Sequence, residues 1–252
     1  MSDVSAGCAE FKFFRRGFRM AALRVWVMAL SGLLLTCPLV AGAVDASAPT
    51  ATDAAVTESP NVTMALSYKL DLLRSSGAAA DTSSSSGNLD IKLRADLDAL
   101  WGWSNSIAYL QVINDHGGKL NGKYLGSLMG SSNVEVPTAT SKVFHAWVQR
   151  NFANDHWSVL TGLYPIDSEF SVMDAAGVFV HPSLGAPAEL GLTRGPSIFN
   201  TSALGVRLRW DGAERDRYAM AALLDGLPGD PGNGHGTHIR FDSGDGVFAI
   251  IE

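Results

Sequence analysis

One strand-like segment constrains the fold of this chain more than any other feature. From Leu89 to Asp98, each apolar residue is followed by a charged one. Side chains of a β-strand point alternately to the two faces of a sheet, so this segment predicts a strand with one apolar and one ionic face. A soluble sheet would bury the apolar face in a core, whereas a membrane barrel turns it to lipid and turns the ionic face to a water-filled lumen.

The N-terminus has the pattern of an export signal. A basic region precedes an apolar run from Val25 to Val40, and Ala41-Gly42-Ala43 supplies the small residues that a signal peptidase recognises. We therefore predict that residues 1–43 form a cleaved signal peptide. The alternative is a transmembrane anchor, for which the apolar run is short.

Export changes the composition of the mature chain. Residues 1–43 contain both cysteines, Cys8 and Cys37, and five basic against two acidic side chains, so their removal changes the net charge from −6 to −9. A chain without cysteine has no disulfide framework and no thiolate metal site. An acidic chain without a basic stripe is unsuited to nucleic acid. The mature sequence also has no second long apolar segment, which excludes a helical membrane protein.

Alternating segments recur along the rest of the sequence. Residues 44–60, rich in Ala, Ser, Thr and Pro without a period, are predicted to be a flexible linker. After them we expect about eight strands, with short turns and long loops in alternation, as in outer-membrane barrels. One short loop helix is expected within residues 168–179, capped by Asp167 or Ser168. The predicted strands cover residues 61–75, 87–98, 106–115, 141–151, 157–164, 202–210, 218–224 and 246–251.

Several of these segments together resemble the OprB-type family of carbohydrate-selective porins. The resemblance implies an all-β fold, an antiparallel transmembrane β-barrel in the bacterial outer membrane. It also implies an aqueous lumen for the passive diffusion of small sugars, with no enzymatic activity, no cofactor and no bound metal. It extends from Val62 to Glu252 and rests on residues 89–98, the loop segment 126–135, Trp147, and residues 160–170, 205–209 and 234–238.

The predicted number of strands departs from this family, whose members are much longer. A barrel with an aqueous channel needs about 16–18 strands, whereas about eight strands close a narrow barrel filled by side chains. The segment from Val247 to Glu252 stops within a strand, with no aromatic C-terminal strand to close on the first strand. We therefore expect residues 61–252 to form the N-terminal part of a porin, as an incomplete barrel.

Charged and amide side chains of the predicted lumen face and of the loops are the candidate substrate-binding residues. A sugar is uncharged and presents hydroxyl groups, for which carboxylates, guanidinium groups and amides are hydrogen-bond partners. The alternative for each residue is a structural role, such as a helix cap for Asp167 or a turn for Asn133. The candidates are Arg94, Asp96, Arg207 and Arg209 from strands and Asn133, Glu135, Asp167 and Glu169 from loops, with Lys69, Asp90 and Lys92 as further lumen-facing charges.

Two other functions remain open from the sequence alone. One is an exported soluble β-domain that binds sugar, and the other is a periplasmic glycosidase with Asp167 and Glu169 as its carboxylate pair. His235 and His238 have metal-binding side chains, but a glycine-rich loop without metal is the favoured interpretation. We expect small sugars and outer-membrane lipid as partners. The sequence leaves open which sugar is bound and whether the chain forms a homo-oligomer.

Overall fold

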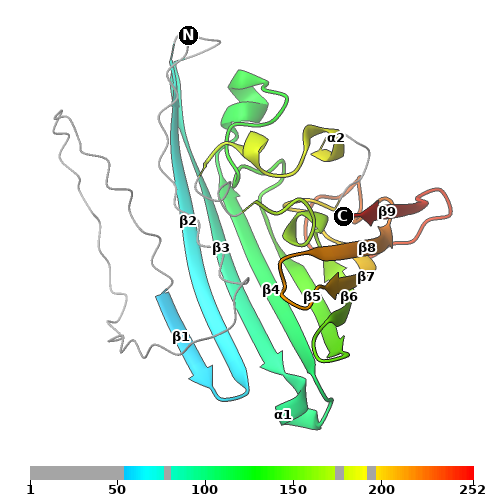
Figure 1. Ribbon diagram of the computed structural model, residues 1–252. Helices are drawn as coiled ribbons and strands as arrows, with labels where there is room; N and C mark the ends of the chain where they lie inside the picture. Colours follow the sequence, from blue (N-terminus) through cyan, green and yellow to red (C-terminus); the bar gives the residue numbers. More distant parts are fainter. Residues whose placement is uncertain (1–53, 77–80, 174–178, 192–196) are drawn as a thin grey trace.

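The computed structural model describes residues 54–76, 81–173, 179–191 and 197–252. Across these residues, nine strands form one antiparallel sheet in which strands adjacent in sequence are adjacent in space (Figure 1). The predicted signal peptide, residues 1–43, lies outside the described residues. The strands are β1 (Ala54–Ser59), β2 (Val62–Ser75), β3 (Thr82–Asp96), β4 (Ser106–Gly117), β5 (Thr140–Phe152), β6 (Trp157–Tyr164), β7 (Ala203–Asp211), β8 (Tyr218–Asp225) and β9 (Val247–Ile251).

Strand β1 lies where a flexible linker was predicted. It pairs with β2, with Ala54 opposite Leu66 and Ser59 opposite Val62. The sequence of β1 has no clear alternation. The strand can form without it, because an edge strand can be held by main-chain groups that every residue carries. The structure therefore corrects the prediction for residues 54–59, while residues 44–53 lie outside the described part of the chain.

Short connections lie at one end of the sheet and long loops at the other. The short end carries residues 60–61, 153–156 and 212–217 together with helix α1 (Leu97–Trp101), which is at the bottom of Figure 1. This asymmetry is typical of outer-membrane barrels. The other end carries the short connection 76–81 and three long loops, 118–139, 165–202 and 226–246. These loops contain the short helices η1 (Asn121–Leu125), η2 (Ile166–Ser168), η4 (Pro182–Leu184) and α2 (Ala188–Gly191).

Strand β3 ends earlier than its alternating sequence predicts. The Asp96 carboxylate accepts the backbone N–H of Asp98 at 3.0 Å and of Ala99 at 3.1 Å, which caps α1. Gly102 ends this helix with a φ of +70°, a conformation that glycine adopts at little cost. Leu97 and Asp98, predicted as the end of a strand, therefore belong to a short helix, because the cap of Asp96 favours a helical turn over continued pairing.

The helix expected within residues 168–179 is also corrected in its described part. A single 3₁₀ turn, η2, precedes it and ends at Ser168, whose hydroxyl donates to the carbonyl of Pro165 at 2.7 Å. Ser171 has a φ of +54°, which is incompatible with a continuous helix. Residues 174–178 lie outside the described part of the chain.

The alternation of the sequence separates two faces of the sheet, as predicted. The outer face presents large apolar side chains that are exposed. The inner face carries polar side chains that are buried, because loops 118–139 and 165–202 pack against it. Examples on the outer face are Leu70, Ile91, Leu93, Leu110, Val206, Leu208 and Leu223, and examples on the inner face are Asp71, Asn88, Asp90, Gln111, Asp115, His145 and Arg207.

A compact apolar cluster fixes loop 165–202 to the inner face of β6, β7 and β8. Ile166 and Phe170 of the loop are buried against residues of the three strands. Burial of a side chain the size of Ile or Phe stabilises the fold by about 1.5–3 kcal/mol, so these two residues anchor the loop firmly. The strand residues of the cluster are Leu160, Tyr164, Ala203, Met220, Ala222 and Leu224.

The sheet is open among the described residues, since β1 pairs with β2 and β9 pairs with β8. This arrangement is consistent with the predicted incomplete barrel, with one strand more than was expected. The helices of the described segments are too short or too polar to cross a membrane.

Candidate functional site

The buried ion pair between Arg207 and Glu169 joins the sheet to loop 165–202. Arg207 points inward from β7 and its side chain is only 3% exposed, whereas that of Glu169 is 22% exposed. The Arg207 Nη2 lies 2.9 Å from the Glu169 Oε2, and its Nε donates to the same oxygen at 3.1 Å. The two residues were both selected from the sequence, and the structure brings them together.

The remaining donors of Arg207 are also occupied. Its Nη1 donates to the Ser158 hydroxyl at 2.5 Å, and its Nη2 donates to the Gln149 side-chain oxygen at 2.9 Å. Gln149, Leu160 and Arg207 lie opposite one another on β5, β6 and β7, which places Gln149 and Arg207 on one inward row. Arg207 is thus fixed in place, and Glu169 is the more accessible member of the pair.

Arg209, two residues further along β7, makes a second ion pair. Its Nη2 lies 2.6 Å from the Asp211 Oδ1, and its guanidinium carbon lies 4.5 Å from the ring centre of Tyr218. The Tyr218 hydroxyl donates to Glu252, whose other carboxylate oxygen accepts the backbone N–H of Ser171 in loop 165–202 at 2.5 Å. Asp211, Tyr218 and Glu252 were missed from the sequence, because neither spacing nor residue type links them to the loop.

A third charged group lies on the inner face of β2, β3 and β4. The Asp90 carboxylate is buried between two ammonium groups, 3.4 Å from the Lys69 Nζ and 3.8 Å from the Lys92 Nζ. The Gln111 side chain donates to the same carboxylate at 2.9 Å. The three charges predicted to face the lumen therefore form one network, and its burial is tolerable because the carboxylate is paired and hydrogen-bonded.

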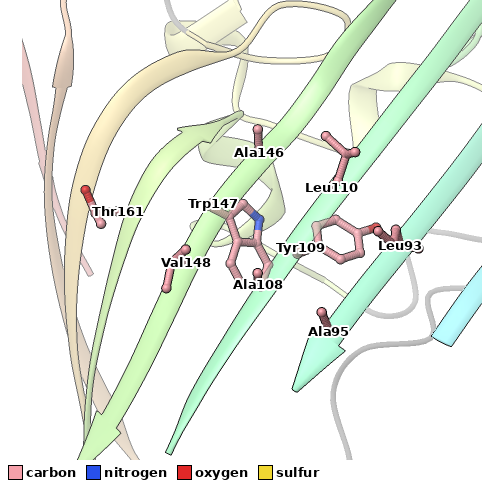
Figure 2. Close-up of a pocket in the computed structure, with 9 residues that line it drawn as sticks. All are labelled: Leu93, Ala95, Ala108, Tyr109, Leu110, Ala146, Trp147, Val148 and Thr161. Carbon is pink, nitrogen blue, oxygen red and sulfur yellow. The ribbon is translucent and has the colours of Figure 1, made fainter. Parts of the chain in front are cut away.

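Two aromatic side chains, Tyr109 and Trp147, lie beside this network. Arg94, Tyr109, Trp147 and Gly162 lie opposite one another on β3, β4, β5 and β6. The rings of Tyr109 and Trp147 are 5.1 Å apart, and Figure 2 shows them side by side on β4 and β5. Gly162 has a φ of +139°, and a Cβ there would lie 2.3 Å from the carbonyl oxygen of Ala146. Glycine is therefore required where β6 passes Trp147.

The other candidates selected from the sequence make bonds within the protein. Asp96 caps α1, and Asn133 donates to the carbonyl of Phe179 at 2.8 Å. The Glu135 carboxylate accepts the backbone N–H of Asn121 at 2.9 Å, at the start of η1. Asp167 accepts the backbone N–H of Phe199 at 3.3 Å. These contacts give the four residues structural roles in the loops.

Two polar contacts that were not predicted fix the long loops to the wall. The Ser132 hydroxyl donates to Asp71 on β2 at 2.6 Å, and Asn200 donates to Asp115 on β4 at 2.8 Å. Asp71 and Asp115 are inward and buried, so their alternation placed them on the lumen face, but only the fold shows their loop partners. The two histidines considered as metal ligands contact each other through the backbone, since the His238 Nε2 donates to the carbonyl of His235 at 2.7 Å. No group of three metal-binding side chains occurs among the described residues.

A shallow hollow lies on the outer face of the wall, where small side chains meet on neighbouring strands (Figure 2). Its volume is about 260 Å³. The lining is apolar, which suits contact with lipid chains better than contact with a sugar. It is lined by Leu93, Ala95, Ala108, Tyr109, Leu110, Ala146, Trp147, Val148 and Thr161.

With this geometry described, the comparisons with known proteins identify the family. The sequence profile of the carbohydrate-selective porin family OprB matches residues 80–252, well over half of the chain. The chain belongs to the OprB family. A comparison with curated proteins finds no match. The family predicted from the sequence is thus confirmed.

A solved structure confirms the fold class. The chain is similar to the high-pH structure of Pseudomonas putida OprB, with a TM-score of 0.57 and 14% sequence identity. The similarity covers 69% of this chain and 43% of that chain, so this chain spans less than half the length of the P. putida porin.

Proposed function

We propose that this protein allows small uncharged sugars to diffuse passively across the bacterial outer membrane through a water-filled lumen. The observation that best supports this proposal is the ion pair of Arg207 with Glu169, which fixes an inward loop against the polar inner face of the wall. The outer face of the same wall is apolar. An apolar outer face meets lipid, and a polar inner face crossed by a loop narrows the path for a solute. Export by a cleaved signal peptide of residues 1–43 belongs to the same proposal.

Two neighbouring parts of the inner face would contact a passing sugar. Trp147, which is partly buried and packs against the buried ring of Tyr109, offers its ring to the apolar face of a pyranose. Arg94, opposite Tyr109 on the neighbouring strand, offers donors to the hydroxyl groups of the sugar. Further along the wall, Glu169 and Arg209 remain partly exposed and offer an acceptor and a donor. We assign Arg207 a positioning role, because its donors are already occupied.

Passage requires that each contact is weak. A pore must bind its solute well enough to admit it and weakly enough to release it on the far side. Side chains that are already paired within the protein, such as Arg209 with Asp211, bind a sugar less tightly than free charges do, because the sugar competes with an existing bond. This arrangement favours exchange over retention.

Sugar influx into proteoliposomes tests the proposal. The protein would be extracted from the outer membrane in the form that cells make, purified in detergent and reconstituted, and glucose influx would be followed by liposome swelling. We expect swelling in glucose that exceeds swelling in a salt of equal osmolarity. Recovery of the protein in a detergent-free periplasmic extract would instead support a soluble sugar-binding domain, and hydrolysis of a chromogenic glycoside would support a glycosidase.

A further inference from the structure

The wall has a notch between β5 and β6 at its long-loop end. Strand β5 begins at Thr140, but its pairing with β6 begins only at Ala146, opposite Leu163. After Tyr164 the chain leaves the wall and enters the inward loop 165–202. The part of β5 before Ala146 therefore has no strand beside it on the β6 side among the described residues. Unpaired backbone groups at such an edge need other partners.

A segment from a distant loop supplies these partners. The Thr237 hydroxyl oxygen accepts the backbone N–H of Val143 at 2.7 Å and donates to the carbonyl of the same residue at 3.1 Å, across 94 residues of sequence. The backbone N–H of Gly236 donates to the Thr140 hydroxyl at 2.8 Å. One side chain thus reproduces the pair of bonds that a neighbouring strand would make.

The loop that carries Thr237 is held in shape by its own contacts. Arg240 lies 3.0 Å from Asp230 and 2.7 Å from Asp242. The N–H of Gly232 and the nearby Arg240 guanidinium lower the pKa of the Asp230 carboxyl below its ordinary value. The Asn233 side chain accepts the N–H of His235 at 3.0 Å. The loop therefore reaches the notch in a preorganised form.

The contact at the notch is close. A Cβ on Gly234 would lie 2.8 Å from the Thr138 hydroxyl oxygen, so the bare glycine backbone lies against the chain that leads into β5. On the other side of the notch, the Ser202 hydroxyl donates to the carbonyl of Phe144 at 2.5 Å. Ser202 ends loop 165–202, so this bond links the notch directly to the loop that carries Glu169.

A cavity of about 290 Å³ lies between these segments. Several of its polar side chains are already bonded within the protein, since Asn200 binds Asp115, Ser202 binds Phe144 and Thr237 binds Val143. It is therefore better described as the seam between a closing segment and the wall than as a ligand site. A seam of this size gives the segment room to move away.

We propose that residues 234–238 form a latch that closes the notch between β5 and β6 and thereby positions loop 165–202 inside the lumen. When the latch opens, the end of β5 loses its bonds to Thr237, and the seam that contains Ser202 widens. The Ser202 end of loop 165–202 then varies in position, whereas the Glu169 end stays held by Ile166, Phe170 and Arg207, and sugar passage varies with the width that the loop leaves. The effect on sugar passage rests on the proposed function, whereas closure of the notch does not.

Replacement of Thr237→Val tests the closure, with Thr201→Val as the matched control. Thr201 lines the same cavity but makes no bond to β5 in the described structure. We expect the Val143 amide to exchange its hydrogen about three- to tenfold faster in Thr237→Val, because the bond that this amide donates to Thr237 is lost. Protein in detergent micelles suffices for this measurement. Equal exchange at Val143 in the two variants would overturn the latch.

A reversible cross-link supplies a second measurement. Cysteines at Thr138 and Gly234 would have Cβ atoms 3.0 Å apart. Disulfides have Cβ atoms about 3.5–4.5 Å apart, so the two segments need to separate by about 0.5 Å for the bond to form. In a background with Cys8→Ser and Cys37→Ser, we expect the oxidised pair to slow exchange at Val143 in a chain that keeps Thr237, and reduction to abolish the slowing. In Thr237→Val the side chain cannot accept the Val143 N–H, so there the oxidised pair holds the segment in place without restoring slow exchange. A disulfide that forms but leaves exchange at Val143 unchanged in the chain with Thr237 would contradict the closed latch.

Glucose influx into liposomes separates the two proposals. If exchange at Val143 responds as expected but no variant, including the unmodified protein, admits glucose, the latch stands and the sugar function fails. If the unmodified protein admits glucose, we expect influx to fall in Thr237→Val and to recover on oxidation of the cysteine pair. Influx that is unchanged in Thr237→Val despite faster exchange would remove the link between latch and loop.

Discussion

Arg207 carries a positive charge into a part of the wall that water hardly reaches. Its counter-ion, Glu169, comes from a loop and not from a neighbouring strand. Removal of one partner from such a pair leaves the other without compensation, and this costs more than the pair contributes. The loop therefore stays against the wall chiefly because its departure would leave Arg207 buried without a counter-ion.

The first prediction concerns this pair. Glu169→Gln keeps the shape of the side chain but removes its charge, so Arg207 loses its counter-ion. We expect a loss of about 1–3 kcal/mol in the free energy of unfolding, measured by urea titration in detergent micelles. Glu214→Gln, in the exposed connection between β7 and β8, is the control and should leave the midpoint unchanged. Equal midpoints for both variants would show that the ion pair contributes little to the free energy of unfolding.

A second prediction at this scale concerns Gly162. Gly162→Ala would place a methyl group against the backbone of Ala146 at a φ that alanine avoids, at a cost of about 1–3 kcal/mol. We expect a lower folded yield, read from heat-modifiable migration on a gel. Gly244→Ala meets open space and should fold like the unmodified protein. A normal yield for Gly162→Ala would mean that β6 can shift away from Trp147.

At the scale of the single element, strand β3 shows what its alternation determines. Leu93 lies on the outer face and is 36% exposed, whereas Arg94 lies inward beside Tyr109. A strand that slips by one residue exchanges all of its faces. The ionic face of β3 therefore fixes both its register and its orientation in the wall.

The third prediction compares Leu93→Arg with Arg94→Leu. An arginine that faces lipid near the middle of the membrane costs about 2–4 kcal/mol, whereas a leucine that faces the lumen costs little. We expect Leu93→Arg to fold in lipid vesicles with a much lower yield than Arg94→Leu, measured by protection from protease. The assignment of faces would be wrong if the two yields were the same.

Elements with a visible period were predictable, and elements without one were not. Strands β2 to β9 follow from alternation that can be read along the chain, whereas β1 depends on pairing with the main chain of β2. For the site, alternation placed Arg207 on the lumen face, but its bond to Glu169 crosses 38 residues. Contacts between a loop and a wall depend on the path of the loop, and local sequence does not encode that path.

At the scale of the whole molecule, the nine strands in the described part of the chain form a sheet with two open edges. The outer edges of β1 and β9 carry backbone donors and acceptors, and each such group left unpaired in hydrocarbon costs several kcal/mol. An open sheet is therefore unstable in a bilayer until further strands pair with both of its edges.

The fourth prediction follows from these edges. We expect residues 44–252, refolded alone into planar bilayers, to give no steady conductance that glucose blocks. The same chain should conduct when strands that pair with β1 and β9 are supplied. Steady, glucose-sensitive conductance from the chain alone would show that its edges find partners, either in the same molecule or in a second copy.

The strictly sequential order of the strands has a consequence for how such a wall can change over time. Each antiparallel pair of strands is a self-contained module, bonded only to the modules before and after it in the sheet. Duplication or loss of one module would alter the girth of the lumen without rearranging the rest. A bond such as that between Thr237 and Val143 limits this freedom, because it ties two particular modules at a fixed spacing. The bonds of Ser132 to Asp71 on β2 and of Asn200 to Asp115 on β4 impose the same limit, so such a change must preserve the contacts between loops and distant strands.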